Sequence, residues 1–134
     1  MKFRIFSATL LLASLFFIIT CKKAEDSSSI PDIYSSWTVL QTDAEGQIYN
    51  VELKFNTDNT FDWILLDSVE GHSNSHIAFE LVDNIMYITQ DTDCSSQGEY
   101  YILEESNKLA IIAIEDYCEP RAEALEYLWE KKTQ

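Results

Sequence analysis

Short apolar runs separated by polar turns dominate this sequence and limit what it can fold into. From Trp37 onward the runs are rich in β-branched and aromatic residues, and in one of them Val51, Leu53 and Phe55 alternate with polar residues. Alternation with a period of two is typical of strands that bury one face. The sequence therefore predicts an all-β fold.

The connections between these runs are too short for crossover helices. We count seven or eight runs in about 100 residues, and the turn at residues 56–60 predicts a tight hairpin in which Asn59 takes a left-handed conformation. Short connections favour antiparallel neighbours, and closure removes the exposed edges. We expect a small antiparallel up-and-down β-barrel of about eight strands. A short helical segment is expected near residues 119–125, followed at 125–130 by either more helix or a last strand.

The N-terminus has the pattern of an export signal. Lys2 and Arg4 precede an uncharged run over residues 5–20, which is shorter than the roughly 20 apolar residues that a spanning helix needs. The residues Ile18–Cys21 resemble the lipobox of bacterial lipoproteins, in which the cysteine is acylated and becomes the new N-terminus. An ordinary secreted protein cut nearby is the alternative.

The lipobox resemblance divides the chain at Cys21. It implies a signal peptide over residues 1–20, a flexible tether over 21–31 that starts at the acylated cysteine, and a folded domain over 32–134. Two or more acyl chains, palmitate among them, hold a protein on a membrane without a spanning helix. We therefore expect a lipid-anchored protein of the bacterial cell envelope, on the periplasmic or surface face of the outer membrane.

Two cysteines remain once Cys21 is assigned to lipidation, namely Cys94 and Cys118. Each follows a predicted strand, and in a meander these two strands end at the same end of the barrel. The oxidising envelope permits a bond between the two loops, so we expect a structural disulfide. A metal site or a reactive thiol would need a CxxC or Cys–His spacing, and neither cysteine has one.

The charge balance narrows the choice of partners. The chain has 23 acidic and 9 basic residues, a net charge of −14, and between residues 32 and 130 the basic residues are Lys54, Lys108 and Arg121. Such an acidic domain cannot bind nucleic acid by neutralising phosphates. It attracts cationic proteins instead.

The pattern resembles the lipocalin-like proteins found among bacterial envelope lipoproteins, over about residues 34–131. The matching features are Trp37 at the first strand, the hairpin Phe55–Phe61, Cys94 followed by Gly98-Glu99-Tyr100, and the ending from Asp116 through Arg121 to Trp129. Serine in place of the glycine of the G-x-W opening and Asn59 in place of the hairpin glycine depart from the family pattern. The resemblance implies binding of a small apolar molecule.

The resemblance also implies which side chains form the site. We expect the barrel interior to contact the ligand through apolar and aromatic residues, drawn from Phe55, Trp63, Phe79, Tyr87, Tyr101, Ile111 and Trp129. Arg121 is expected to stack on Trp37 as a cation–π lid at the closed end, with pairing to Asp116 or Glu119, or anchoring of a ligand, as alternatives.

The sequence contains only weak patterns of the kind typical of metal-binding or catalytic sites. His72 and His76 lack a third patterned ligand, and the run from Asp91 lacks the glycine and the final glutamate of a calcium loop. No spacing singles out a nucleophile or an acid and base pair, so we expect neither a cofactor, a metal nor an enzyme. The remaining alternative to ligand binding is an acidic protein-interaction module, such as an inhibitor of lysozyme-type hydrolases, with contacts from the loop at residues 70–75.

Overall fold

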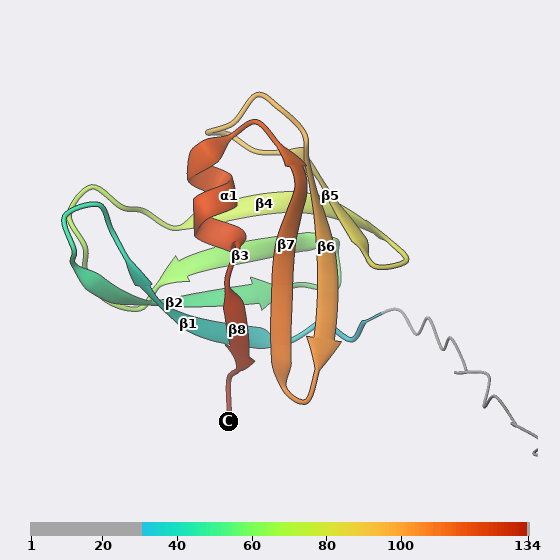
Figure 1. Ribbon diagram of the computed structural model, residues 1–134, viewed down its shortest axis with the longest axis horizontal. Coiled ribbons are helices and arrows are strands. Elements are labelled where there is room, and N and C mark those ends of the chain that lie inside the picture. Colours follow the sequence, from blue (N-terminus) through green and yellow to red (C-terminus); the bar gives the residue numbers. More distant parts are fainter. Residues whose placement is uncertain (1–30, 134) are drawn as a thin grey trace, which may run out of the picture.

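Eight strands close into one antiparallel barrel in chain order in this computed structural model, which describes residues 31–133 (Figure 1). The predicted signal segment, Cys21 and the tether up to residue 30 lie outside the described residues. The elements are β1 (Ser36–Thr42), β2 (Ile48–Phe55), β3 (Thr60–Leu65), β4 (Ser75–Val82), β5 (Ile85–Gln90), β6 (Gly98–Glu105), β7 (Lys108–Asp116), α1 (Glu119–Leu125) and β8 (Leu128–Lys131). The predicted all-β up-and-down barrel with a short helix is confirmed. At residues 125–130 the helix ends at Leu125, and a last strand, β8, begins at Leu128.

Tight turns connect strands at one end of the barrel because their residues accept a positive φ. Asn59, Asp83, Ser106 and Asn107 all lie in this left-handed region, at φ values of 53° to 65°. Asn and Asp tolerate this conformation better than other non-glycine residues. The two successive positive angles at Ser106 and Asn107 match the twist of β6 and β7, which pair along their full length.

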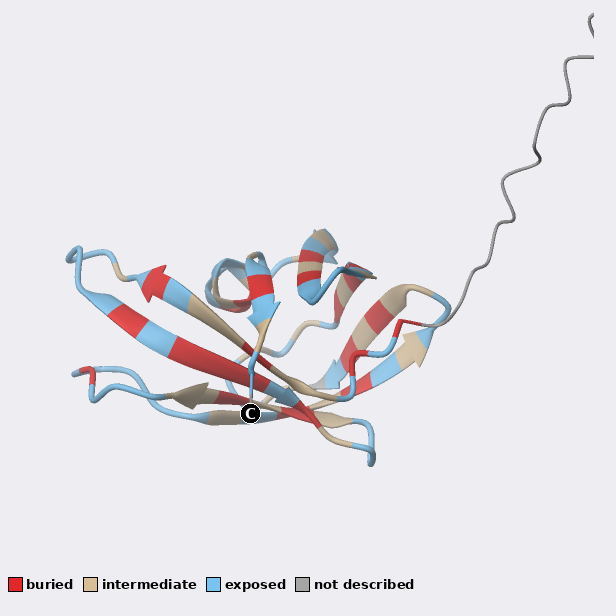
Figure 2. Cartoon of the chain, turned by 90° about the horizontal axis from the view of Figure 1, so that it is seen from below, coloured by how far each residue is buried: buried red, intermediate tan, exposed pale blue. Residues whose placement is uncertain are grey.

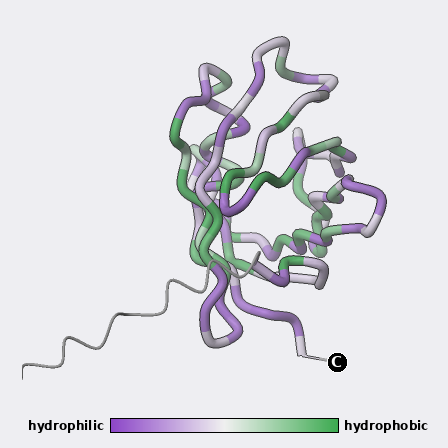
Figure 3. The backbone as a smooth tube through the Cα atoms, turned by 90° about the vertical axis from the view of Figure 1, so that its right-hand side faces the viewer, coloured by the Kyte–Doolittle hydropathy of each residue, from purple (hydrophilic) through white to green (hydrophobic). Residues whose placement is uncertain are grey.

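Burial alternates along the strands, as Figure 2 shows in its red and pale blue bands. The inward side chains form one core, which includes the fully buried Trp37, Phe61, Tyr100 and Trp129. Along the tube in Figure 3, hydrophobic stretches lie in the strands, and hydrophilic residues gather in the hairpin loops. Within residues 31–133, no helix has the length and apolar character to cross a membrane.

The two ends of the barrel differ in how they are covered. At one end, which we call the closed end, the short hairpins gather, and the segment before β1 inserts the fully buried Ile33. Trp37 Nε1 donates to the Ile33 carbonyl at 3.0 Å, which holds this plug in place. The other end, which we call the open end, carries the three longer loops and α1. The chain therefore enters the barrel at the end opposite these loops.

Helix α1 completes a seam where strand pairing is short. β8 pairs with only three residues of β7 and two of β1, so the open-end halves of β7 and β1 lack a strand between them. Figure 1 shows α1 beside this part of β7, directly above β8. Gln41 Nε2 donates to the Ala124 carbonyl at 2.8 Å, and Glu126 Oε1 accepts from the Ala113 amide at 2.9 Å. The helix is thus attached to both strands that flank the seam.

Two of the predicted interior residues, Tyr87 and Tyr101, face away from the core. Tyr101 is exposed at 38%, whereas its neighbour Tyr100 is fully buried. Tyr87 is half-buried, and its neighbours Met86 and Ile88 are the inward residues of β5. Both segments are apolar on either face, so alternation does not determine which residue points inward. The prediction for these two tyrosines is therefore corrected.

Candidate functional site

A cavity of about 340 Å³ opens between the loops and α1 at the open end, and we call it the open-end cavity. Phe61, Trp63 and Ile77 contribute its strand-borne apolar wall, and Leu125 closes it from the helix. All four side chains are buried. The loops β3–β4 and β5–β6 supply its polar rim, which includes His72, Ser73, Asp91 and Asp93. An apolar floor beneath a polar rim suits a small amphipathic molecule.

A second cavity of about 340 Å³, the side cavity, lies next to the first. Trp63, His72, Pro120 and Ala124 line both cavities, so the two spaces meet at these side chains. Its remaining lining includes three carboxylates and the ring of Tyr49. The acidic residues are Asp43, Glu45 and Glu123.

Trp63 lies at the junction of the two cavities and carries a polar Nε1–H group. It is 8% exposed, and its Nε1 is buried with no hydrogen-bond partner among residues 31–133. The Nε1 atoms of Trp37 and Trp129 are also in the core, but each donates to a backbone carbonyl, at 3.0 and 3.1 Å. A buried donor without a partner is unfavourable by about 1–3 kcal/mol. Trp63 therefore holds an unused donor in the wall of the site.

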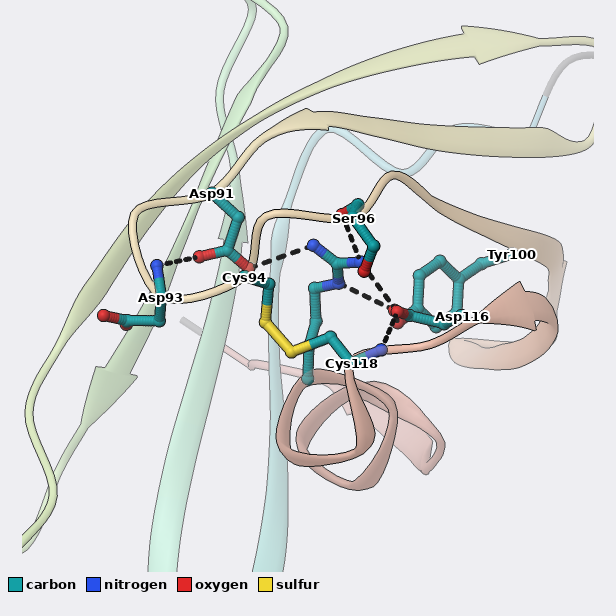
Figure 4. A network of polar contacts seen from close by, with 8 residues as sticks. Asp91, Asp93, Cys94, Ser96, Tyr100, Asp116 and Cys118 are labelled. Carbon is teal, nitrogen blue, oxygen red and sulfur yellow. Dashed lines mark hydrogen bonds and ion pairs between the residues drawn. A yellow bond between two sulfur atoms is a disulfide. The ribbon is translucent and has the colours of Figure 1, made fainter.

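Arg121 organises the rim from the first turn of α1. Its Nε and Nη2 each donate to the Asp116 carboxylate at 2.7 Å, its Nη1 to Asp91 Oδ2 at 3.2 Å, and its Nη2 to the Ser96 carbonyl at 2.9 Å. The hydroxyl of Tyr100 donates to the same Asp116 carboxylate. The Asp116 carboxylate, the Asp91 carboxylate and the Ser96 carbonyl thus surround the guanidinium group between loop β5–β6 and β7 (Figure 4). This network ties the loop and the helix to the barrel.

The disulfide lies beside this network. Cys94 of loop β5–β6 and Cys118 before α1 are bonded, with their Cα atoms 5.9 Å apart (Figure 4). The Cys118 amide donates to Asp116 Oδ1 at 2.8 Å. Loop residues reach across the open end to form the bond, in agreement with the sequence prediction. Loop and helix are therefore held together both covalently and by Arg121.

Burial and pairing set the protonation of the network. Burial alone would raise the pKa of Asp116, but hydrogen bonds from Arg121 and Tyr100 outweigh it and bring the pKa below its usual value. Burial and the neighbouring carboxylate raise the pKa of Tyr100, which stays neutral and donates. Burial disfavours the charged form of Arg121, yet the contacts to Asp116 raise its pKa. The arginine and aspartate are therefore an ion pair at neutral pH.

The lowered pKa of Asp116 predicts acid sensitivity. Because the folded state holds the carboxylate charged, this pair stabilises the fold above the ordinary aspartate pKa of about 4, and the contribution is lost as pH falls through the lowered value. As the pH is lowered from 5 to 3, we expect the urea concentration at the unfolding midpoint to decrease in the wild type. The variant Asp116→Asn should have a lower midpoint at pH 5 and should show a smaller decrease. An equal drop in both proteins would contradict this role for Asp116.

Gly98 allows the network to pack against the backbone of β6. A Cβ at this position would lie 2.7 Å from Asp116 Oδ2, 2.9 Å from Arg121 Nη2 and 2.9 Å from Tyr100 Cε2. Substitution Gly98→Ala should therefore destabilise the fold by about 1–3 kcal/mol, as overpacking does. Gly46→Ala is a control of backbone conformation without crowding, since nothing lies within 4 Å of its Cβ position. Urea unfolding of both variants measures the difference, and equal losses would argue against crowding at Gly98.

The predicted Arg121–Trp37 lid is wrong. Trp37 belongs to the closed end, whereas Arg121 lies at the open end and pairs with Asp116, the alternative partner weighed above. Lys131 takes the place over the Trp37 ring, with Nζ 5.4 Å from its centroid. The end of β8 runs next to the start of β1, which explains why this lysine reaches the ring.

The two histidines have separate partners. His76 Nδ1 lies 2.5 Å from Asp62 Oδ1, and the His72 ring packs against Tyr49 with centroids 5.3 Å apart. Among the described residues no group of three or more His, Cys, Asp or Glu side chains is arranged to hold a metal. Asp91 is engaged by Arg121 and by the Asp93 amide.

Trp63 is the predicted interior residue that lines the open-end cavity. Phe55 and Phe79 pack edge to face in the core, 5.4 Å apart, and Ile111 and Trp129 are buried there as well. Sequence reasoning did not include the helix residues Ala124 and Leu125, whose place in the wall depends on α1 filling the seam.

The eight-stranded antiparallel barrel is compatible with a lipocalin-like fold. Comparison with known proteins gives no match to a family model, to a curated protein or to a solved structure.

Proposed function

We propose that this chain is a lipid-anchored envelope protein whose lipocalin-like barrel binds a small hydrophobic molecule at its open end. The observation that carries the proposal is the open-end cavity, whose volume of about 340 Å³ lies in the range of small-molecule sites. Its apolar wall, which includes Phe61, Trp63 and Ile77, supplies the area to remove such a ligand from water. The proposal assigns a binding role and no catalytic step.

The anchor and the cavity are compatible in this arrangement. The first described residues cover the closed end through Ile33, so the chain reaches the barrel on the side opposite the cavity. An anchor at Cys21 then leaves the mouth unobstructed. Substitution Cys21→Ser should move the protein from the membrane fraction to the soluble fraction, and mass spectrometry of the wild-type N-terminus should show acyl chains. An unmodified cysteine would contradict the anchor without bearing on ligand binding.

Ligand binding is tested with N-phenyl-1-naphthylamine, a neutral dye that fluoresces in apolar surroundings. We expect saturable enhancement with one site per chain. Ala124 lines both cavities, so Ala124→Phe should fill the space and weaken binding about tenfold or more. Ala110→Phe is the matched control, because Ala110 pairs with Leu103 and Leu128 away from the cavity. The absence of saturable binding, or equal losses in both variants, would overturn the proposal.

A second candidate function is binding of a cationic protein, such as a lysozyme. The observation that favours it is an apolar face on β6 to β8, where Tyr101, Leu103, Ile112 and Leu128 are each at least 38% exposed. Tyr101 pairs with Ile112, so these side chains are neighbours on one face. The chain is strongly acidic, which favours a basic partner.

A lysozyme activity assay at low and at high salt tests this second candidate. Inhibition that weakens with salt, and that is lost in Tyr101→Ser/Ile112→Ser but kept in Ala124→Phe, would support the outer face. No inhibition at low salt would eliminate lysozyme as the partner.

A further inference from the structure

The charge arrangement around the two cavities restricts which ligands they accept. Arg121 is the single lysine or arginine in the wall of the open-end cavity, as far as residues 31–133 are concerned. Its side chain is 3% exposed, and all three of its nitrogens are engaged by Asp116, Asp91 and the Ser96 carbonyl. A carboxylate or phosphate on a ligand would therefore find no available guanidinium. It would have to displace a buried carboxylate to obtain one.

The rims of both cavities carry negative charge, as a ligand with a carboxylate or a phosphate does. Asp93 is exposed beside the open-end cavity, and the side cavity is lined by Asp43, Glu45 and Glu123. Like charges placed together at a binding site disfavour the wrong partner strongly. The acidic rims therefore disfavour the binding of anionic ligands.

Trp63 Nε1 is the one buried side-chain polar atom without a hydrogen-bond partner among residues 31–133. The Trp63 ring lines both cavities, and its buried Nε1 hydrogen has no acceptor within the described part of the chain. The atom has no exposed surface, so a ligand reaches it by displacing the side chains that cover it. The exposed loop residues Gly71, His72 and Ser73 line the same cavity. An oxygen on the ligand is the acceptor that this donor lacks.

Resting on the ligand-binding function proposed above, we infer that the open-end cavity selects apolar molecules that present an oxygen acceptor to Trp63 and carry no negative charge. Fatty acids and other lipophilic carboxylates are excluded by this inference. Neutral ketones, ethers and alcohols of aromatic size, and their cationic relatives, are the expected class.

Four naphthalenes of similar size test the inference by displacing N-phenyl-1-naphthylamine from the wild-type protein. We expect 2-acetylnaphthalene to bind about tenfold tighter than 2-ethylnaphthalene, because only the ketone accepts a hydrogen bond. The 2-naphthylmethylammonium cation, which has no oxygen acceptor and tests the effect of charge alone, should still bind, and 2-naphthoate should bind at least tenfold more weakly than the ketone. Raising the salt concentration should narrow the gap between cation and anion.

Variants assign these preferences to named groups. Trp63→Phe keeps an apolar ring and should remove the preference for the ketone, while the affinity for 2-ethylnaphthalene changes by about twofold or less. Glu45→Gln/Glu123→Gln should raise the affinity for 2-naphthoate, whereas Glu80→Gln/Glu105→Gln, which removes the same charge from exposed sites elsewhere on the barrel, should not. Circular dichroism is used to check that each variant is folded.

The outcomes separate this inference from the function it rests on. Saturable dye binding with equal affinities for ketone and hydrocarbon, or with 2-naphthoate as tight as the ketone, overturns the inference and leaves the binding function standing. If Trp63→Phe does not fold, the wild-type comparison of ketone, hydrocarbon and anion decides alone. Failure of the dye and of all four naphthalenes to bind overturns the proposed function itself.

Discussion

Substitution Arg121→Met should destabilise the barrel by about 3–5 kcal/mol, because it leaves two buried carboxylates without their counter-charge. The side chains of Asp116 and Asp91 are 0% and 5% exposed, and Arg121 is the cation that both of them contact. Methionine keeps an unbranched apolar stem but removes every donor. Urea unfolding at pH 7, followed by tryptophan fluorescence, measures the loss.

Two further variants show whether the loss comes from unpaired buried charge. Lys108→Met removes a cation from an exposed pair, 3.9 Å from Glu130, and should change the stability by less than about 1 kcal/mol. Arg121→Met/Asp116→Asn removes one of the two unpaired buried charges and should recover about half of the loss. If Arg121→Met is no more harmful than Lys108→Met, the network does not stabilise the fold.

The strand framework could be predicted because its signals are local. Polar turns with Asn59 and the pair Ser106 and Asn107 mark hairpins by residues that tolerate positive φ, and alternation identifies strands such as β2. Once the turns are located, the short connections predict the strand order. The strand order then predicts the disulfide, because it brings the loops that contain Cys94 and Cys118 to the same end of the barrel.

The orientation of two strands could not be predicted. In β6, Tyr100 and Tyr101 are adjacent and chemically identical, so a shift of one residue is invisible in the sequence. A register irregularity between Glu99 and Tyr100 also changes the phase of β6 against β7. In the sequence, Gly98 stands out only as part of the lipocalin-like resemblance. Its physical role, which is to leave room for Asp116 and Arg121, needs three-dimensional contacts.

The site itself depends on contacts between distant parts of the chain. The family resemblance predicts Arg121 on Trp37, but α1 begins directly after the open end of β7, close to Asp116 and far from the closed end. No pattern in the sequence separates the Nε1 of Trp63 from those of Trp37 and Trp129. The difference is that Ile33 and Leu125 offer carbonyls to the other two.

Removal of the disulfide is expected to have the second large effect on stability. The bond closes a loop with a sequence separation of 24, for which the chain-entropy model gives about 3.5 kcal/mol. Cys94→Ser/Cys118→Ser should lose about that much free energy of unfolding. Dithiothreitol should lower the free energy of unfolding of the wild type by a similar amount. It should leave the free energy of unfolding of the double variant unchanged. Free thiols mapped to Cys94 and Cys118 in the untreated wild type would contradict the bond.

The disulfide and Arg121 attach the same loop to the same helix, so their losses should not be independent. Cys94 and Asp91 lie in loop β5–β6, and Cys118 and Arg121 lie at the start of α1. Removing one attachment lets the loop move and weakens the other. The variant Cys94→Ser/Cys118→Ser/Arg121→Met should therefore lose less free energy of unfolding than the sum of the two separate losses.

The same variant should also bind N-phenyl-1-naphthylamine more weakly than Cys94→Ser/Cys118→Ser or Arg121→Met, because Asp91, Cys94 and Arg121 all line the open-end cavity. Additive losses with unchanged dye affinity would show that the two attachments act separately and away from the site.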